Sequence, residues 1–132
     1  MKGVDTNILV RFLVGDDEQQ AEQVYRMFRK AELDKQELFV SLLVVLELIW
    51  VLESVYEIER KDIIDTLNEL LLMPILKFEQ QSALRQCMQA AQKNSCDLSD
   101  LLIAHSAWEQ DCEAVITFDR KAAKYDLFEL LE

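Results

Sequence analysis

The chain has 132 residues, of which 51% are hydrophobic and 30% are charged, so it is long enough to bury a core and too apolar to be disordered. Its formal net charge of -11, from 14 basic and 25 acidic residues, argues against nonspecific binding to nucleic acid. Two glycines and one proline leave little room for linkers, and we predict a single domain over residues 1–132.

The sequence shows no targeting or membrane segment. Asp5 stands where the apolar region of a secretory signal would run. The apolar stretch 38–52 is shorter than the about 20 residues that cross a bilayer, and it contains Glu47. Three dispersed cysteines suggest reduced thiols and favour neither a disulfide framework nor a zinc knuckle. We therefore expect a soluble, cytoplasmic protein that does not bind membranes.

The first part of the chain predicts two short strands, each followed by a helix. Residues 2–4 predict a strand that ends at Asp5, and Asp16 and Asp17 are suited to cap the next helix. Apolar residues recur in that helix with helical spacing at Ala21, Val24, Tyr25 and Phe28. A short buried strand follows at 38–40, and Ser41 is a plausible N-cap for the helix that carries Glu47.

The rest of the chain continues this alternation. Pro74 ends a helix of about residues 59–72, and the later pattern predicts a strand at 75–78, helices at 80–93 and 101–108, and a strand at 114–118. Short apolar strands that alternate with helices imply an α/β fold with a parallel sheet covered on both faces. Ligands of such folds bind beyond the carboxyl ends of the strands, where Asp5 and Asp119 are expected.

Acidic residues at the edges of the apolar segments are the main candidates for function. A lone carboxylate is costly to desolvate, so several in such places suggest a shared site. Two carboxylates about 5 Å apart repel by roughly 3 kcal/mol at an effective dielectric near 20, which a bound cation would relieve. Oxygen ligands suit Mg²⁺, with Mn²⁺ as the alternative, whereas His105 is the only histidine and zinc fits poorly. The candidates are Asp5, Glu47, Asp97, Asp100 and Asp119.

Each of these residues also has a simpler interpretation. Asp5 could cap the following helix through an Asx-type turn, and Glu47 could reach solvent at the edge of its face. Asp97 and Asp100 could form a helix cap with an acidic first turn, while Asp119 could be an ordinary turn residue. His105 is expected to pack or face solvent, and not to act in catalysis. Nucleophilic triads and glycine-rich phosphate loops have no match in this chain.

Four segments together resemble the signature segments of PIN-domain nucleases, most closely the VapC-type toxins of bacterial toxin-antitoxin systems. They are Val4–Arg11, Leu46–Leu48, Asp97–Ala104 and Thr117–Arg120, which occur in the family's order and spacing. One departure is Leu101, where many relatives carry a small residue. The resemblance implies a three-layer α/β/α PIN-like domain with a short central parallel sheet.

The resemblance also implies roles for individual residues. Asp5, Glu47, Asp100 and Asp119 would form the catalytic acidic quartet, in which Asp5 and Asp100 ligate Mg²⁺ directly. Supporting positions would be Asn7, Asp97 and Thr117. The implied activity is divalent-metal-dependent hydrolysis of RNA phosphodiester bonds, in which a metal-bound water attacks. The implied partners are RNA, a second copy of the chain, and an antitoxin whose basic segment covers the acidic groove.

The alternative is a non-catalytic regulatory or binding module with an acidic pocket. A receiver-like phosphoacceptor domain also has a parallel sheet and an acidic Mg²⁺ pocket. It would need an aspartate after the middle strand and a lysine after a late one, but Ser41 and Asp119 stand there. The sequence therefore favours the nuclease.

Overall fold

The computed structural model describes all residues, 1–132, and has an α/β fold with parallel strands. The predicted fold class is thus confirmed. In chain order the elements are β1 (Lys2–Gly3), α1 (Thr6–Leu13), α2 (Glu18–Leu33), β2 (Leu38–Val40), α3 (Leu42–Ser54), α4 (Arg60–Leu71), β3 (Leu76–Phe78), α5 (Gln81–Ala91), α6 (Leu98–Glu109), β4 (Val115–Thr117), the 3-10 turn η1 (Ala122–Lys124) and β5 (Phe128–Leu130). No helix is long and apolar enough to cross a membrane.

Local capping explains where several helices begin. The Asp17 carboxylate accepts from the backbone N–H of Gln20 at 3.0 Å, and the Ser41 hydroxyl accepts from that of Val44 at 3.2 Å. Both satisfy an N–H group that the first turn leaves free, as predicted. Helix α4 ends at Leu71, three residues before Pro74, and its buried side chains are Ile63, Ile64, Leu67, Leu70 and Leu71. Tyr25 differs from its prediction, because its side chain is 49% exposed.

The strands form two separate parallel sheets. Strands β1, β2 and β3 are neighbours in that order, and β4 pairs with β5. Gly3 lies opposite Phe39, and Phe39 opposite Lys77, whereas in the second sheet Ile116 lies opposite Glu129. The parallel strands agree with the prediction, but they are not hydrogen-bonded into one continuous sheet. Strand β5 and η1 were not predicted.

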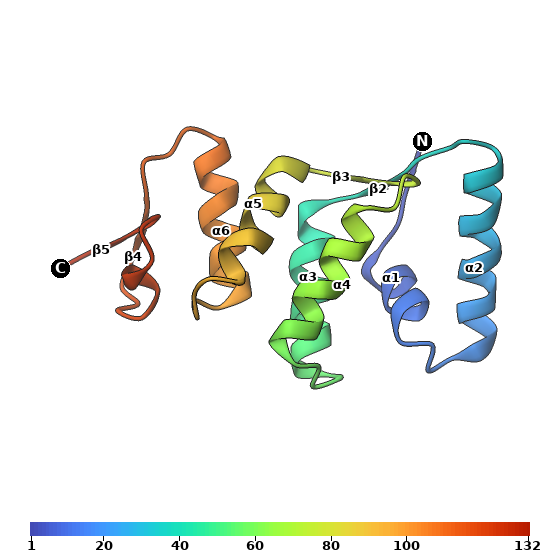
Figure 1. The fold of residues 1–132 in the computed structure, drawn as a ribbon, viewed down its shortest axis with the longest axis horizontal. Helices are drawn as coiled ribbons and strands as arrows, with labels where there is room; N and C mark the ends of the chain where they lie inside the picture. The colour runs from blue at the N-terminus through green and yellow to red at the C-terminus, as the bar shows by residue number, and fades with distance from the viewer.

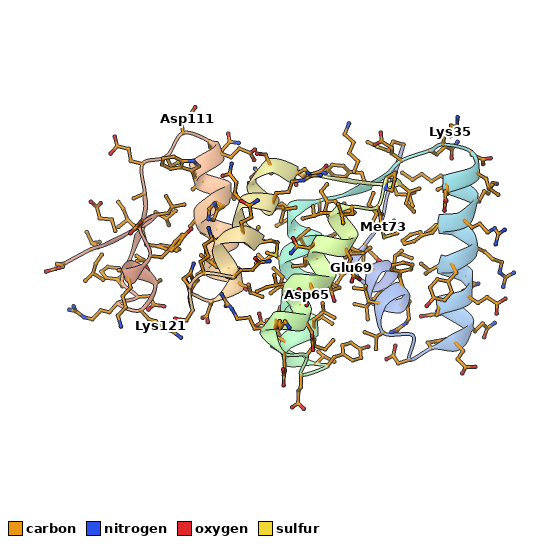
Figure 2. The ribbon with its side chains drawn as sticks, viewed as in Figure 1. Lys35, Asp65, Glu69, Met73, Asp111 and Lys121 are labelled. Carbon is orange, nitrogen blue, oxygen red and sulfur yellow. The ribbon has the colours of Figure 1, made fainter.

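One hydrophobic core runs through the length of the molecule. It comprises 31 buried residues and includes Val40, Ile63, Leu101 and, near the C-terminus, Phe128. Helices α5 and α6 pack against each other, and α4 packs on α5. The molecule is elongated, with α2 at one end and the β4–β5 pair beyond α6 at the other (Figure 1). Lys35 after α2 and Lys121 before η1 lie towards opposite ends of this long axis (Figure 2). The two sheets are therefore far apart in one copy.

Candidate active site

The first pair of candidate acids lies where α1 meets α3. Asp5 follows the end of β1 and is the N-cap of α1, because its carboxylate accepts from the backbone N–H of Ile8 at 3.2 Å. Thr6 is buried, and its hydroxyl donates a hydrogen bond to the carboxylate of Glu47, which projects from the middle of α3. We call Asp5 and Glu47 the N-terminal acidic pair. The helix cap explains the position of Asp5 and uses one of its two carboxylate oxygens.

Three further carboxylates lie near the start of α6 and the end of β4. Asp97 is at the N-cap position of α6 but makes no capping hydrogen bond, and Asp100 is in the first turn of the helix. Burial raises the pKa of Asp100, and the negative charges of Asp97 and Asp119 raise it further, against an opposing effect of Lys121. Asp97 and Asp119 therefore lie close enough for their charges to act on Asp100. We call Asp97, Asp100 and Asp119 the C-terminal acidic group.

Asp119 is held by a tight turn after β4. Its backbone N–H donates to the hydroxyl of Thr117 at 3.0 Å. One oxygen of its carboxylate accepts from the backbone N–H groups of Lys121 at 2.9 Å and Ala122 at 3.2 Å. Thr117 thus orients the turn that presents Asp119, which gives a physical basis for its predicted supporting position.

The structure gathers the predicted acids in two sets that do not meet within one copy. No group of three or more histidine, cysteine or acidic side chains is placed to hold a metal ion. The charges that shift the pKa of Asp100 come from Asp97, Asp119 and Lys121, and not from Asp5 or Glu47. Their elements are also separated, because β1 and β4 belong to different sheets. One copy therefore presents two partial sites.

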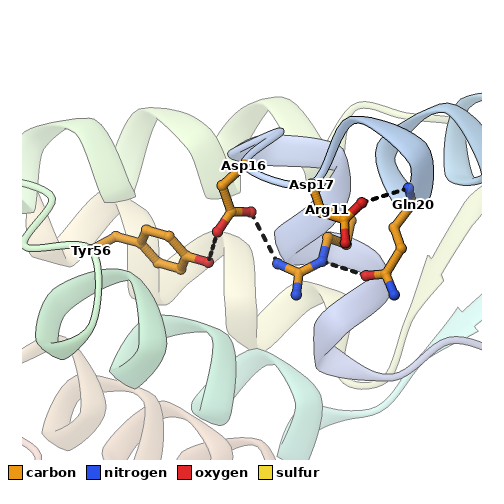
Figure 3. A network of polar contacts seen from close by, with 5 residues as sticks. All are labelled: Arg11, Asp16, Asp17, Gln20 and Tyr56. Carbon is orange, nitrogen blue, oxygen red and sulfur yellow. Dashed lines mark hydrogen bonds and ion pairs between the residues drawn. The ribbon is translucent and has the colours of Figure 1, made fainter.

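A polar network that the sequence did not indicate lies beside Asp5. Arg11 donates through Nε to Gln20 at 2.6 Å and through an Nη to Asp16 at 3.0 Å, and the Tyr56 hydroxyl donates to Asp16 at 2.8 Å (Figure 3). The hydrogen bond from Tyr56 and the charge of Arg11 lower the pKa of Asp16. The network joins the loop after α1 to the loop after α3.

Asn7 and Arg11 line the same hollow as Asp5. The two residues are four apart on α1, a spacing that places side chains on one face of a helix. Arg11 is the last residue of the family-like segment Val4–Arg11, but no role was predicted for it. The supporting position predicted for Asn7 thus lies next to Asp5 and a guanidinium group, which suits the binding of an anionic substrate.

His105 lies in the packing between α6 and the C-terminal segment. Its side chain is buried, and its Nε2 is 2.8 Å from the hydroxyl of Tyr125. Burial lowers the pKa of the imidazole. The expectation that His105 packs is confirmed.

Comparison with known proteins places this chain in a family. The model of the PIN domain matches residues 3–127, which include every predicted site residue. The chain belongs to the PIN-domain family. A similar protein is the "VapC ribonuclease" of Aquifex aeolicus (strain VF5), which is 28% identical over 124 residues. The alignment covers 94% of this chain and 91% of that protein, so the likeness extends over the whole PIN domain.

Proposed function

We propose that this PIN-domain protein is a metal-dependent endoribonuclease and the toxin of a toxin-antitoxin pair. The observation that carries the proposal is the full-length likeness to a VapC ribonuclease, together with the family match over residues 3–127. The name of that relative supports RNA as the substrate and an antitoxin as the partner. The acidic quartet Asp5, Glu47, Asp100 and Asp119 is proposed as the catalytic set, with Asn7, Asp97 and Thr117 in support.

PIN-domain nucleases use divalent metal ions, and the donor chemistry here suits a hard cation. Every proposed ligand is a carboxylate, which Mg²⁺ and Mn²⁺ prefer over the nitrogen and sulfur donors that zinc favours. The arrangement within one copy does not fit, because no three such side chains are placed to hold one metal ion. We therefore propose Mg²⁺ as the ion on chemical grounds and derive no catalytic step through it for a single copy.

The partner proposed for this toxin has a basic segment. A chain with a net charge of -11 repels polyanions at long range and attracts cations. Arginine side chains that enter the acidic sets would form charge-assisted hydrogen bonds with carboxylates that have free oxygens. An antitoxin of this kind would compete with both metal and RNA for the acidic groups.

The first test is cleavage of RNA by the purified chain. We expect cleavage in Mg²⁺ or Mn²⁺ and none with excess chelator. Asp5→Asn, Glu47→Gln and Asp100→Asn should each lower the rate by at least about 100-fold, as expected when a group that stabilises developing charge is lost. His105→Ala is the matched control and should keep most of the activity, because His105 packs against Tyr125 and not near an acid.

A non-catalytic acidic module is the second candidate, and the separation of the acids within one copy favours it. Such a module would bind a basic partner and leave RNA intact in every metal tested. Growth arrest on expression, relieved by Asp5→Asn, would support the toxin. Intact RNA together with normal growth would support the module.

A further inference from the structure

Both sheets end in a strand whose outer edge is unpaired. The N–H of Val4 donates to the carbonyl of Phe39, so the groups of Gly3, one residue earlier, point away from β2. In the second sheet, the N–H of Val115 donates to the carbonyl of Leu127, and the carbonyl of Thr117 accepts from the N–H of Leu131. The groups of Ile116 between them therefore point away from β5. Gly3 and Ile116 thus offer backbone donors and acceptors at two free edges, which are templates for pairing with another strand.

The free edge of β4 is also apolar. The side chains of Ile116 and Phe118 are 62% and 79% exposed, although parallel strands are normally buried on both faces. The face of the first sheet that carries Gly3, Phe39 and Lys77 has no fully buried member. Each sheet therefore has exposed side chains beside its free edge, at β1 in the first sheet and at β4 in the second.

The exposed area of the chain is large enough for a second copy. One copy exposes 8565 Å², whereas a compact monomer of 15.4 kDa exposes about 7,200 Å². The excess, about 1,400 Å², exceeds the about 800 Å² per partner that a standard protein interface buries. The shape in Figure 1 accounts for this excess, because the β4–β5 pair extends beyond α6.

The β4 strand cannot reach β1 of its own copy without leaving its place on α6. The connection between α6 and β4 spans only residues 110–114. Ala122 and Phe128 of the same segment belong to the hydrophobic core, and Tyr125 contacts His105 of α6. Pairing of β4 with β1 of the same chain would break these contacts. Pairing of β4 with β1 of a second copy leaves them intact.

We propose that two copies exchange strands, so that β4 of each pairs in parallel with β1 of the other and both active sites are composite. Each resulting sheet has the three strands of one copy and the two of the other. With Gly3 opposite Thr117 of the second copy, the Gly3 N–H can donate to the carbonyl of Ile116, and Asp5 and Asp119 both follow at the same carboxyl end of the sheet. Asp5 and Glu47 then face Asp100 and Asp119 from the other copy. The assembly is a closed dimer with two equivalent sites.

The composite site rests on the proposed nuclease function, whereas the strand exchange does not. The activity test mixes two inactive variants, Asp5→Asn and Asp119→Asn, after unfolding and refolding them together. A mixed dimer would hold one site with both substitutions and one with neither, so random pairing restores about a quarter of the wild-type activity. The matched control mixes Asp5→Asn with Glu47→Gln, which change the same half of the site and restore nothing.

A second measurement, the mass in solution, needs no activity. The wild type should have twice the 15.4 kDa mass of the chain. Ile116→Pro removes the N–H at the free edge of β4 and should give a folded monomer, whereas Ile116→Val keeps that donor and the dimer.

Three results would overturn the strand exchange: a monomeric wild type, a dimeric Ile116→Pro, or an active wild type whose Asp5→Asn and Asp119→Asn mixture stays inactive. A dimer that behaves as expected but never cleaves RNA would instead refute the nuclease function alone.

Discussion

Asp100 shows how an acidic site can cost folding stability. Its place in the first turn of α6 favours the carboxylate through the helix dipole. Burial and the neighbouring charges of Asp97 and Asp119 outweigh that benefit, because together they raise the pKa of Asp100. A carboxyl whose pKa is higher in the folded state destabilises the fold once it is ionised. The cost is absent below the ordinary value of 3.8 and complete above the raised pKa.

Asp100→Asn should therefore raise the free energy of unfolding at pH 7, by about 0.5 kcal/mol after allowance for screening by solvent. Denaturant titrations at pH 7 and pH 3 would measure this, and the gain should disappear at the lower pH. Asp65→Asn, at an exposed position on α4, is the control and should change little. A loss of stability at pH 7 would show that the helix dipole dominates after all.

His105 should make the fold sensitive to mild acid. Burial lowers the pKa of its imidazole below the ordinary 6.5, so the unfolded chain takes up a proton more readily than the folded one. Its contribution to stability is then complete above 6.5 and is lost as pH falls through the lowered value. The free energy of unfolding of the wild type should decline more steeply than that of His105→Gln as the pH falls from 7 to 5. Parallel curves would contradict this.

At the scale of elements, Arg60 fixes the connection that leads into the C-terminal acidic group. Its guanidinium donates to the carbonyls of Cys96 at 2.7 Å and of Ala91 and Asn94 at 3.1 Å each. One planar side chain from the start of α4 thus donates hydrogen bonds to backbone carbonyls at the end of α5 and in the loop before α6. No short-range pattern marks this role, because the partners are more than 30 residues away in sequence.

Arg60→Met should lower the free energy of unfolding by about 3 kcal/mol, because three partly buried carbonyls lose a charged donor. Arg60→Lys should recover only part of the loss, since an ammonium group cannot bridge them in the same plane. Chemical denaturation would measure both. Arg85→Met, at an exposed position of α5, should stay within about 0.5 kcal/mol of the wild type. An equal loss of stability in the two methionine variants would show that Arg60 stabilises the fold no more than an exposed arginine does.

The elements themselves were largely predictable, and their limits were set by local chemistry. Ser41 and Asp17 mark helix starts, and the periodic leucines and isoleucines of α4 identify its buried face. Strand β5 escaped prediction because three residues after a turn carry too little periodicity. Asp5 illustrates a double role: the capping interpretation is confirmed by its bond to Ile8, and the catalytic one stays a prediction.

At the scale of the whole molecule, the arrangement of the strands could not be read from the sequence. Alternation of strands and helices predicts parallel pairing, but the choice of neighbours depends on contacts far apart in the chain. The predicted meeting of Asp5 and Asp119 assumed that their strands share a sheet, whereas they lie in separate sheets here. Which acids share a site thus depends on what completes those two edges.

Mg²⁺ should raise the average mass of the protein in solution by favouring the dimer. In the strand-exchanged dimer, the N-terminal acidic pair of one copy faces acids of the other, and each copy already carries a net charge of -11. Repulsion between these carboxylates opposes association, and a divalent ion bound by both halves would favour it by mass action. Mg²⁺ should therefore shift a dilute sample towards dimer more than NaCl of equal ionic strength, which only screens.

Analytical ultracentrifugation of matched samples would measure this shift, and two variants sharpen it. Asp5→Asn should dimerise readily in either salt, because one carboxylate that repels the second copy is gone, and its response to Mg²⁺ should shrink. Ile116→Pro should stay monomeric in both, because the backbone donor at the edge of β4 is lost. If Mg²⁺ and NaCl shift the wild type equally, the acids of the two copies do not share an ion, and the composite site is wrong even if the dimer itself is present.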